Sequence, residues 1–224
     1  MPFEYVSWAR FYRLCGTLYR RIDGAGFRPD LIIAIARGGY PVARVLADYF
    51  GLMDLFSLKI EHYRGPDKLP TAVIRYPLPV DISGRRVLLV DDVSDSGDTF
   101  KVALAHLEAR GAPQVLRTAV LHHKRGAALE PDYHAQKVLK WRWITYPWAL
   151  VEDLSVLAAR LAPPPDGAAQ LARRLRQELD FPLPLGLWPQ IGPIVLARAA
   201  ELRSAASGAD DQGIVQIVQQ TEDR

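Results

Sequence analysis

The chain has 224 residues, which is room for one medium-sized domain and a small appendage. Its content of 49% apolar and 24% charged residues is typical of a soluble globular protein, and no apolar run approaches the length of about 18 residues that spans a membrane. The single cysteine, Cys15, excludes a disulfide framework within the chain and predicts a reducing, cytoplasmic location. The net charge of +3 suits a small anionic ligand and is too low to predict a nucleic-acid partner.

The first two thirds of the chain alternate between helical and strand-like patterns. Helices are predicted from apolar residues at helical spacing, from Pro near the start and from Gly past the end, at 7–24, 41–51 and 98–112. Strands are predicted from apolar runs between turn residues, at 31–36, 55–63, 72–79, 85–93, 114–124 and 137–148. This order predicts an α/β fold with a mostly parallel sheet flanked by helices.

The pattern changes after Trp148, where helical segments follow one another without strands. Helices are predicted at 151–162, 168–179 and 194–207, with a stiff "PPPDG" linker after the first and an irregular stretch after the second. We therefore expect one domain over residues 1–162 and a small helical C-terminal extension over 163–224, whose last dozen or so residues look disordered.

The segment "VLLVDDVSDSGDTF", residues 87–100, carries the strongest functional signal. A buried strand ends in Asp91 and Asp92 and feeds a small polar loop that opens a helix, which is the position of ligand sites at the carboxyl edge of α/β sheets. The loop "DSGDT" offers backbone N–H groups and hydroxyls to a phosphate. The two carboxylates can accept hydrogen bonds from vicinal hydroxyls or hold Mg²⁺. A phosphate beside a diol describes a ribose 5-phosphate.

This segment resembles the phosphoribosyl pyrophosphate (PRPP) motif of the type I phosphoribosyltransferases. "IIAIARGGYPVARVLADYFG" resembles the pyrophosphate loop of the xanthine-guanine and hypoxanthine branch, and "KVLKWRWITYPW" resembles the base-binding segment of that branch. The likeness covers roughly residues 1–152 and implies a purine enzyme with the type I phosphoribosyltransferase fold.

The resemblance also implies roles for individual residues at the PRPP site. Asp91 and Asp92 would face the ribose hydroxyls and hold Mg²⁺ directly or through water, and Asp95 would lie near N7 of the purine. A cis peptide is expected between Ala36 and Arg37. The residues that would bind PRPP and its phosphates are Arg37, Gly38, Gly39, Asp91, Asp92, Ser94, Asp95, Ser96, Gly97, Asp98 and Thr99. Those that would act in catalysis are Asp95, Asp91, Asp92 and Arg37.

For the purine base, the resemblance implies that Lys124 donates to the exocyclic oxygen at C6, that Trp143 stacks on the base and that the Ile144 backbone reads its edge. His62 and Tyr63 would begin the flap that closes over PRPP, although the family usually has Ser-Tyr there. Since Lys124 only donates, 6-oxopurines (hypoxanthine, guanine or xanthine) are favoured over adenine.

The expected reaction converts PRPP and a purine base to the nucleoside 5′-monophosphate and pyrophosphate, with Mg²⁺ as cofactor. Relatives imply a homodimer or homotetramer, with no nucleic acid and no membrane among the partners. Adenine as the substrate is one alternative, because some relatives with C-terminal extensions use it. Another is a PRPP-sensing regulatory protein with the same fold.

Several other residues have simpler explanations. His122 and His123 are neighbours on a strand and so face opposite ways, which argues against a metal site. Cys15 lies on the apolar stripe of the first helix and is expected in the core. Arg173, Arg174 and Arg176 are expected to form a solvated helix face.

Overall fold

The computed structural model describes residues 2–63, 71–181 and 184–208. The chain forms two compact units, one of Tyr12–Lys140 and one that combines Met1–Phe11 with Trp141–Arg224. Helix α1 (Trp8–Gly24) begins in the second of these and continues into the first. The predicted boundary between a phosphoribosyltransferase domain (1–162) and a C-terminal extension (163–224) is a different division of the chain, and it stays a prediction.

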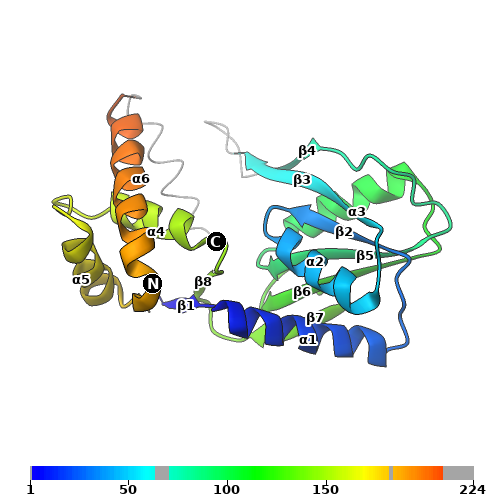
Figure 1. The fold of residues 1–224 in the computed structure, drawn as a ribbon. Helices are drawn as coiled ribbons and strands as arrows, with labels where there is room; N and C mark the ends of the chain where they lie inside the picture. The colour runs from blue at the N-terminus through cyan, green and yellow to red at the C-terminus, as the bar shows by residue number, and fades with distance from the viewer. Residues whose placement is uncertain (1, 64–70, 182–183, 209–224) are drawn as a thin grey trace. The chain divides into compact units, whose positions relative to one another are not determined.

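The unit Tyr12–Lys140 is built on a six-stranded sheet with the order β4-β3-β2-β5-β6-β7 (Figure 1). All neighbouring strands run parallel except β4, which returns antiparallel to β3. The strands are β2 (Leu31–Ala36), β3 (Leu55–Tyr63), β4 (Thr71–Tyr76), β5 (Arg86–Ser94), β6 (Val115–Lys124) and β7 (Tyr133–Val138). This confirms the predicted, mostly parallel α/β sheet.

Helices cover the sheet because its central strands are apolar on both faces. All six residues of β2 are buried, as expected for a parallel strand between two helical layers. Helix α3 (Asp98–Arg110) packs on one face through Phe100, Ala103 and Leu107. Helix α2 (Gly39–Phe50) packs against β2 and β5, and Tyr19 of α1 packs against Phe50 of α2 with ring centroids 4.8 Å apart.

The other unit contains a two-stranded parallel sheet and a group of helices. Strand β1 (Phe3–Tyr5) pairs with β8 (Trp143–Thr145). The helices are α4 (Leu150–Ala159), α5 (Ala168–Leu179), the 3₁₀ helix η1 (Leu185–Leu187) and α6 (Trp188–Gly208). Their shared core joins Leu154 and Leu157 of α4 to Leu171, Leu175 and residues further along the chain, and it includes Phe3, whose ring lies 5.3 Å from that of Phe181. The apolar residues of the extension therefore pack on α4 and β1.

Two of the predicted elements differ most from the structure in their bounds. The segment predicted as one strand over 137–148 contains parts of two strands in different sheets, β7 and β8. The residues between them belong to neither strand, and Leu139 there is 67% exposed. Helix α6 begins at Trp188 and not at residue 194. Pro189 is tolerated because the first N–H groups of a helix have no intrahelical partner, and Pro193 lies inside the helix although it cannot donate an intrahelical hydrogen bond. Strand β1 was not predicted at all.

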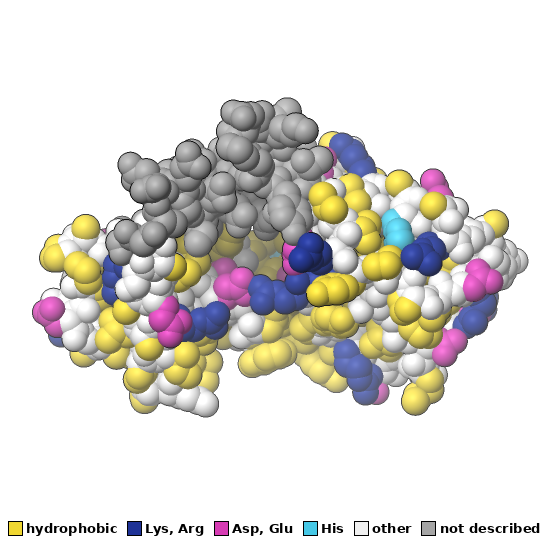
Figure 2. All heavy atoms as spheres, turned by 90° about the horizontal axis from the view of Figure 1, so that it is seen from above, with side chains coloured by type: hydrophobic (Ala, Val, Ile, Leu, Met, Phe, Trp, Pro, Cys, Tyr) yellow, Lys and Arg dark blue, Asp and Glu magenta, His cyan; other side chains and the backbone are white. Residues whose placement is uncertain are grey.

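Charged side chains are spread over the surface. On the face shown in Figure 2, lysines and arginines lie singly or in small groups, and acidic side chains lie beside several of them. None of the helices in the described part of the chain has the length and apolar character to cross a bilayer.

Candidate active site

The parallel strands of the six-stranded sheet bring three predicted site segments to one edge. Strand β2 ends at Ala36 just before Arg37, β5 carries Asp91 and Asp92 near its end, and β6 ends at Lys124. Because β2, β5 and β6 are adjacent and parallel, their carboxyl ends meet, which is where α/β sheets bind ligands. The predicted PRPP segments therefore lie on neighbouring strands.

The loop after β2 approaches β5 too closely for side chains. The peptide bond between Ala36 and Arg37 is cis, as predicted. A Cβ atom at Gly38 would lie 2.2 Å from Oδ2 of Asp92, and one at Gly39 would lie 2.4 Å from the carbonyl oxygen of Val90. Both glycines are thus needed for this approach, and the Arg37 side chain is exposed beside them.

The two acids at the end of β5 differ in environment. Asp91 is only 9% exposed, and its Oδ1 accepts a hydrogen bond of 2.9 Å from the backbone N–H of Asp92. Asp92 is partly buried, with its carboxylate beside Gly38. Two neighbouring carboxylates next to a glycine loop can accept hydrogen bonds from hydroxyl groups or coordinate a divalent cation, but they repel a phosphate.

The predicted phosphate loop turns at Gly97 and opens α3. Gly97 has φ +89°, and a Cβ atom there would lie 2.8 Å from the backbone nitrogen of Leu129. The loop is supported from behind, since the N–H of Ala128 donates to the carbonyl oxygen of Ser96 at 2.8 Å. The Asp98 side chain is about half exposed and pairs with Lys101 at 3.3 Å, so it faces solvent and not the loop.

Ser96 and Thr99 complete this loop, and Ser94 lies beneath it. The Ser96 hydroxyl is the acceptor for the backbone N–H of Asp98 at 3.3 Å, which helps to set the turn. Ser96 is exposed and Thr99 is partly buried, whereas Ser94 is buried. Hydroxyls and N–H groups are therefore presented together at the N-terminus of α3, a favourable place for an anion.

Lys124 and Asp95 form a charged pair at the same edge of the sheet. Nζ of Lys124 donates to Oδ2 of Asp95 at 2.7 Å. The Lys124 side chain is 6% exposed and that of Asp95 29% exposed, so the pair lies at the border between core and solvent. The structure thus brings together Asp95, predicted to lie near N7 of the purine, and Lys124, the predicted base-binding lysine.

The predicted flap residues are described only in their backbone. His62 and Tyr63 end β3, where they pair with Ala72 and Thr71 of β4. Residues 64–70 of the flap lie outside the described residues.

Trp143 and Ile144, predicted to bind the base, lie on β8 in the other unit, paired with Phe3 and Glu4 of β1. The Trp143 ring is partly buried, and its Nε1–H donates to Oδ2 of Asp153 at 3.0 Å. Burial raises the pKa of the Asp153 carboxyl to about 6, against the opposing effect of the Trp143 hydrogen bond. Sequence reasoning missed Asp153, because an acid in the first turn of a helix is common and only the folded contact gives it a role.

Three other sequence interpretations can be compared with the structure. Cys15 is completely buried, and burial raises the pKa of its thiol to about 12, which agrees with a core residue. His122 and His123 are buried, and the described residues contain no group of three or more His, Cys, Asp or Glu side chains placed to hold a metal. Arg173 and Arg176 are exposed as expected, but Arg174 is only 17% exposed in its side chain.

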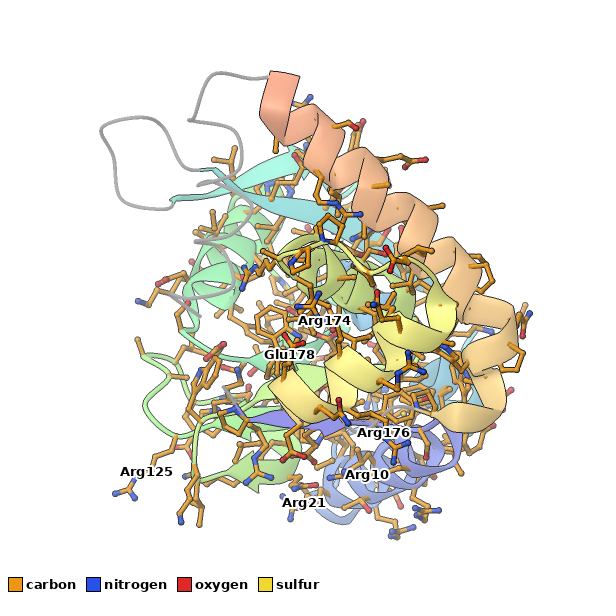
Figure 3. All side chains as sticks on the ribbon, turned by 90° about the vertical axis from the view of Figure 1, so that its left-hand side faces the viewer. Arg10, Arg21, Arg125, Arg174, Arg176 and Glu178 are labelled. Carbon is orange, nitrogen blue, oxygen red and sulfur yellow. The ribbon has the colours of Figure 1, made fainter. Side chains whose placement is uncertain are left out.

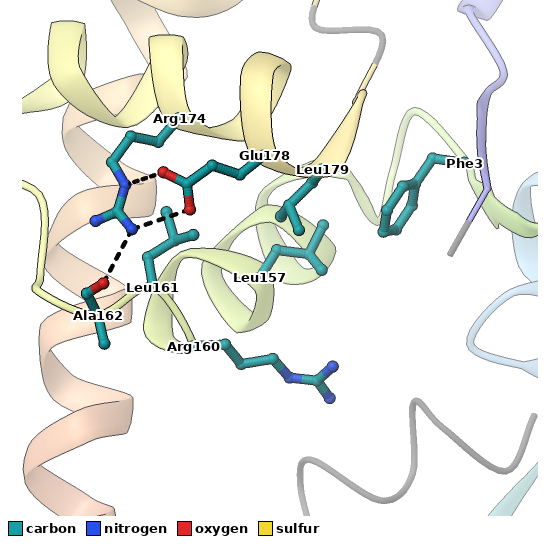
Figure 4. A pocket seen from close by; sticks show the side chains of 8 residues that line it. All are labelled: Phe3, Leu157, Arg160, Leu161, Ala162, Arg174, Glu178 and Leu179. Atoms are coloured by element: carbon teal, nitrogen blue, oxygen red, sulfur yellow. Dashed lines mark hydrogen bonds and ion pairs between the residues drawn. The ribbon is translucent and has the colours of Figure 1, made fainter.

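Arg174 instead forms part of the wall of a cavity of about 490 Å³ in the helical unit, lined also by Phe3, Leu157, Arg160, Leu161, Ala162, Glu178 and Leu179 (Figure 4). Arg174 binds Glu178 one turn further along α5 and the carbonyl oxygen of Ala162 at 3.2 Å. Arg176 lies on the opposite side of α5 (Figure 3). Arg174 therefore ties α5 to the segment that follows α4.

Comparison with known proteins agrees with this geometry. The family model of the phosphoribosyl transferase domain matches residues 4–153. The hypoxanthine-guanine phosphoribosyltransferase of Saccharomyces cerevisiae is 28% identical over 189 residues, covering 65% of this chain and 85% of that protein. The crystal structure of a purine phosphoribosyltransferase from Pyrococcus horikoshii superposes with a TM-score of 0.60 and 32% identity, covering 66% of this chain and 95% of that one.

The chain is also similar to a protein that is named as a regulator and not as an enzyme. The transcriptional regulator GfcR of Methanothrix thermoacetophila is 33% identical over 97 residues, covering 43% of this chain and 47% of that protein. The family model nevertheless spans the cis-peptide loop, the acidic strand end, the phosphate loop and the Lys124–Asp95 pair together. The chain therefore belongs to the type I phosphoribosyltransferase family, in its purine branch.

Proposed function

We propose that the chain transfers the 5-phosphoribosyl group of PRPP to a 6-oxopurine base and releases pyrophosphate. The observation that carries the proposal is the Lys124–Asp95 pair, 2.7 Å apart, next to the phosphate loop and the acidic strand end. A purely PRPP-binding protein needs the loop and the two acids, but it has no need for a buried ammonium held on a further carboxylate. Such a pair suits a substrate that must lose a proton and present an oxygen.

In this proposal the loop residues bind the anionic ends of PRPP. Arg37 and the backbone of Gly38 and Gly39 hold the pyrophosphate, and the N-terminus of α3 holds the 5-phosphate. Asp91 and Asp92 accept hydrogen bonds from the ribose hydroxyls. Their negative field stabilises the positive charge that develops on the ribose ring as the bond from C1 to pyrophosphate breaks.

Asp95 and Lys124 act on the base. As the purine nitrogen bonds to C1, Asp95 accepts the proton that the base gives up. Lys124 holds the Asp95 carboxylate through a charge-assisted hydrogen bond, and its N–H groups favour an oxygen at C6. The amino group of adenine would meet Lys124 donor to donor, and a site built on such a hydrogen bond discriminates strongly. The flap that begins at His62 and Tyr63 closes over PRPP and excludes water.

The donor set also fits a magnesium ion. Asp91 and Asp92 supply carboxylate oxygens at one strand end, and Mg²⁺ is commonly held by one or two carboxylates together with substrate phosphates. The ion would neutralise charge on the departing pyrophosphate. Homodimeric or homotetrameric assembly and a cytoplasmic location remain part of the proposal.

The test is release of pyrophosphate from PRPP and Mg²⁺ with adenine, hypoxanthine, guanine, xanthine and uracil in turn. We expect the highest kcat/KM with a 6-oxopurine, and Lys124→Met should lower the ratio of 6-oxopurine to adenine turnover by roughly tenfold or more. Lys137→Met is the matched control, because Lys137 is exposed and pairs only at 3.4 Å with Glu130. A higher kcat/KM for adenine would contradict the preference. PRPP binding without turnover of any base would instead favour a regulatory protein.

A further inference from the structure

Residues 37–39 form the loop that holds pyrophosphate in the proposed function, and on one side this loop meets β5. There Gly38 and Gly39 approach Asp92 and Val90 so closely that a Cβ atom at either glycine would collide with them. Gly38 is also the N-cap of α2, and it has no side chain that could cap the helix. Because two successive glycines leave the backbone wide conformational freedom, a contact on the opposite side, toward β3, would restrict the loop to one geometry.

Tyr40 supplies a contact on that opposite side. It is the first residue after the two glycines, and its backbone N–H donates to the carbonyl oxygen of Arg37 at 3.2 Å. Its hydroxyl lies 2.7 Å from Oγ of Ser57, which is 17 residues further along the chain on β3. Ser57 stands opposite Ala34 in the register of β2 and β3, two residues before β2 ends. The Tyr40 side chain therefore joins the start of α2 to the strand beside β2.

Neither of the two hydroxyls is required by packing. The Tyr40 side chain is 47% exposed, and phenylalanine would cover the same apolar area. Ser57 lies between Phe56 and Leu58 on β3, where β-branched and aromatic residues are usually favoured. Since both hydroxyls can bond to water when they are apart, their hydrogen bond adds little to the stability of the whole chain. The pair is explained by the part of the molecule that it holds in place.

We infer that Tyr40 and Ser57 are positioning residues for pyrophosphate, and that their hydrogen bond holds loop 37–39 in the geometry that binds this anion. The inference rests on the proposed function, in which Arg37 and the backbone of the two glycines hold the pyrophosphate. Without the hydrogen bond, the binding geometry is only one of several that the loop adopts, and the apparent affinity falls in proportion to its population. The net contribution of a single hydrogen bond corresponds to a factor of roughly 2–13 in affinity.

The experiment measures affinities by calorimetric titration for the wild-type chain, Tyr40→Phe, Ser57→Ala and the double variant. One ligand is magnesium pyrophosphate, and the other is whichever of guanosine and adenosine 5′-monophosphate the wild type binds more tightly. Each single variant should bind pyrophosphate roughly 3–10-fold more weakly, and the double variant should be no weaker than either, because all three lack the same bond. Affinity for the monophosphate should change by less than about twofold, since its phosphate is held at the start of α3 and not by loop 37–39.

Tyr76→Phe is the matched control, because Tyr76 ends β4, which is two strands away from β2, and its side chain is 63% exposed. This variant loses the same hydroxyl group and should keep both affinities. Unchanged pyrophosphate affinity in Tyr40→Phe, additive losses in the double variant, or equal weakening of both ligands would overturn the inference. A wild-type chain that binds pyrophosphate but turns over no purine would overturn the proposed function instead, whereas one that binds neither ligand would overturn both.

Discussion

Replacing Gly38 by alanine should damage the PRPP site while leaving the fold intact. The new Cβ atom would lie 2.2 Å from Oδ2, 2.5 Å from Cγ and 2.7 Å from Oδ1 of Asp92, and real Cβ contacts shorter than 3.0 Å are essentially absent. The obstructing atoms are the end of a partly buried side chain, so the Asp92 carboxylate can withdraw by rotating. A displacement of roughly 1 Å in a group that positions substrate can cost about 10²-fold, which is the loss that we expect in kcat/KM for PRPP.

Gly39→Ala is the informative contrast, because its obstruction is backbone. The Cβ atom would lie 2.4 Å from the carbonyl oxygen of Val90 in the middle of the sheet, which cannot rotate away. Overpacking of this kind costs typically about 1–3 kcal/mol, and at the upper end this lowers the midpoint of thermal unfolding by about 6–12 °C for a chain of this length.

Gly16→Ala serves as the control for both variants. Gly16 lies within α1, where an added Cβ atom would meet only Arg20 at an ordinary 3.5 Å, so the variant should be as stable as the wild type or more stable. Calorimetry and PRPP titrations of the three variants provide the test. A Gly38→Ala protein that binds PRPP with wild-type affinity would refute the reasoning, since the position of Asp92 would then be unimportant.

Three further outcomes are expected. Asp95→Asn should lower kcat by roughly 10²-fold while PRPP still binds, and an unchanged kcat would exclude Asp95 from proton transfer. The same variant should lower the free energy of unfolding measured in urea, because Lys124 loses its charged partner, and the double variant with Lys124→Met should regain stability but not activity. The pKa of Asp153 is raised to about 6, so the folded chain binds the proton more tightly, and the unfolding free energy should fall by at most about 3 kcal/mol as pH rises from about 4 to 6; the same slope in Asp153→Asn would argue against this. Truncation after Ala162 should expose Leu154 and Leu157 to solvent and cause aggregation or loss of solubility. A soluble product with unchanged assembly and activity would show that the extension is dispensable.

The sequence predicted best those elements whose signals are local. Strand β3 and helix α5 were predicted with the bounds they have. An apolar strand between turn residues, and an amphipathic helix after a Pro/Gly linker, can each be recognised from about a dozen consecutive residues. The acidic strand end and the loop "DSGDT" were likewise evident, since strand, loop and helix are consecutive in the chain.

What escaped prediction depends on partners that are distant in sequence. The three residues of β1 form a strand only because β8, some 140 residues later, pairs with them. The break between β7 and β8 could not be seen, because the apolar residues Leu139 and Trp141 look like strand positions although both are exposed. The pairing of Lys124 with Asp95 follows from strand adjacency, but the hydrogen bond from Trp143 to Asp153 is a side-chain contact that no spacing encodes.

The core shared by Phe3 and Phe181 has a consequence for synthesis of the chain on the ribosome. Residues near the N-terminus emerge first, yet the pairing partner of β1 begins at Trp143 and the ring against Phe3 belongs to residue 181. The strand must therefore wait, uncovered, until most of the polypeptide has been translated, whereas the six-stranded sheet is complete once Val138 has emerged. At about 5–20 residues per second, the wait from Tyr5 to the emergence of Trp143 and Phe181 lasts roughly 7–35 s. During that time Phe3–Tyr5 are available to chaperones or to association with another copy.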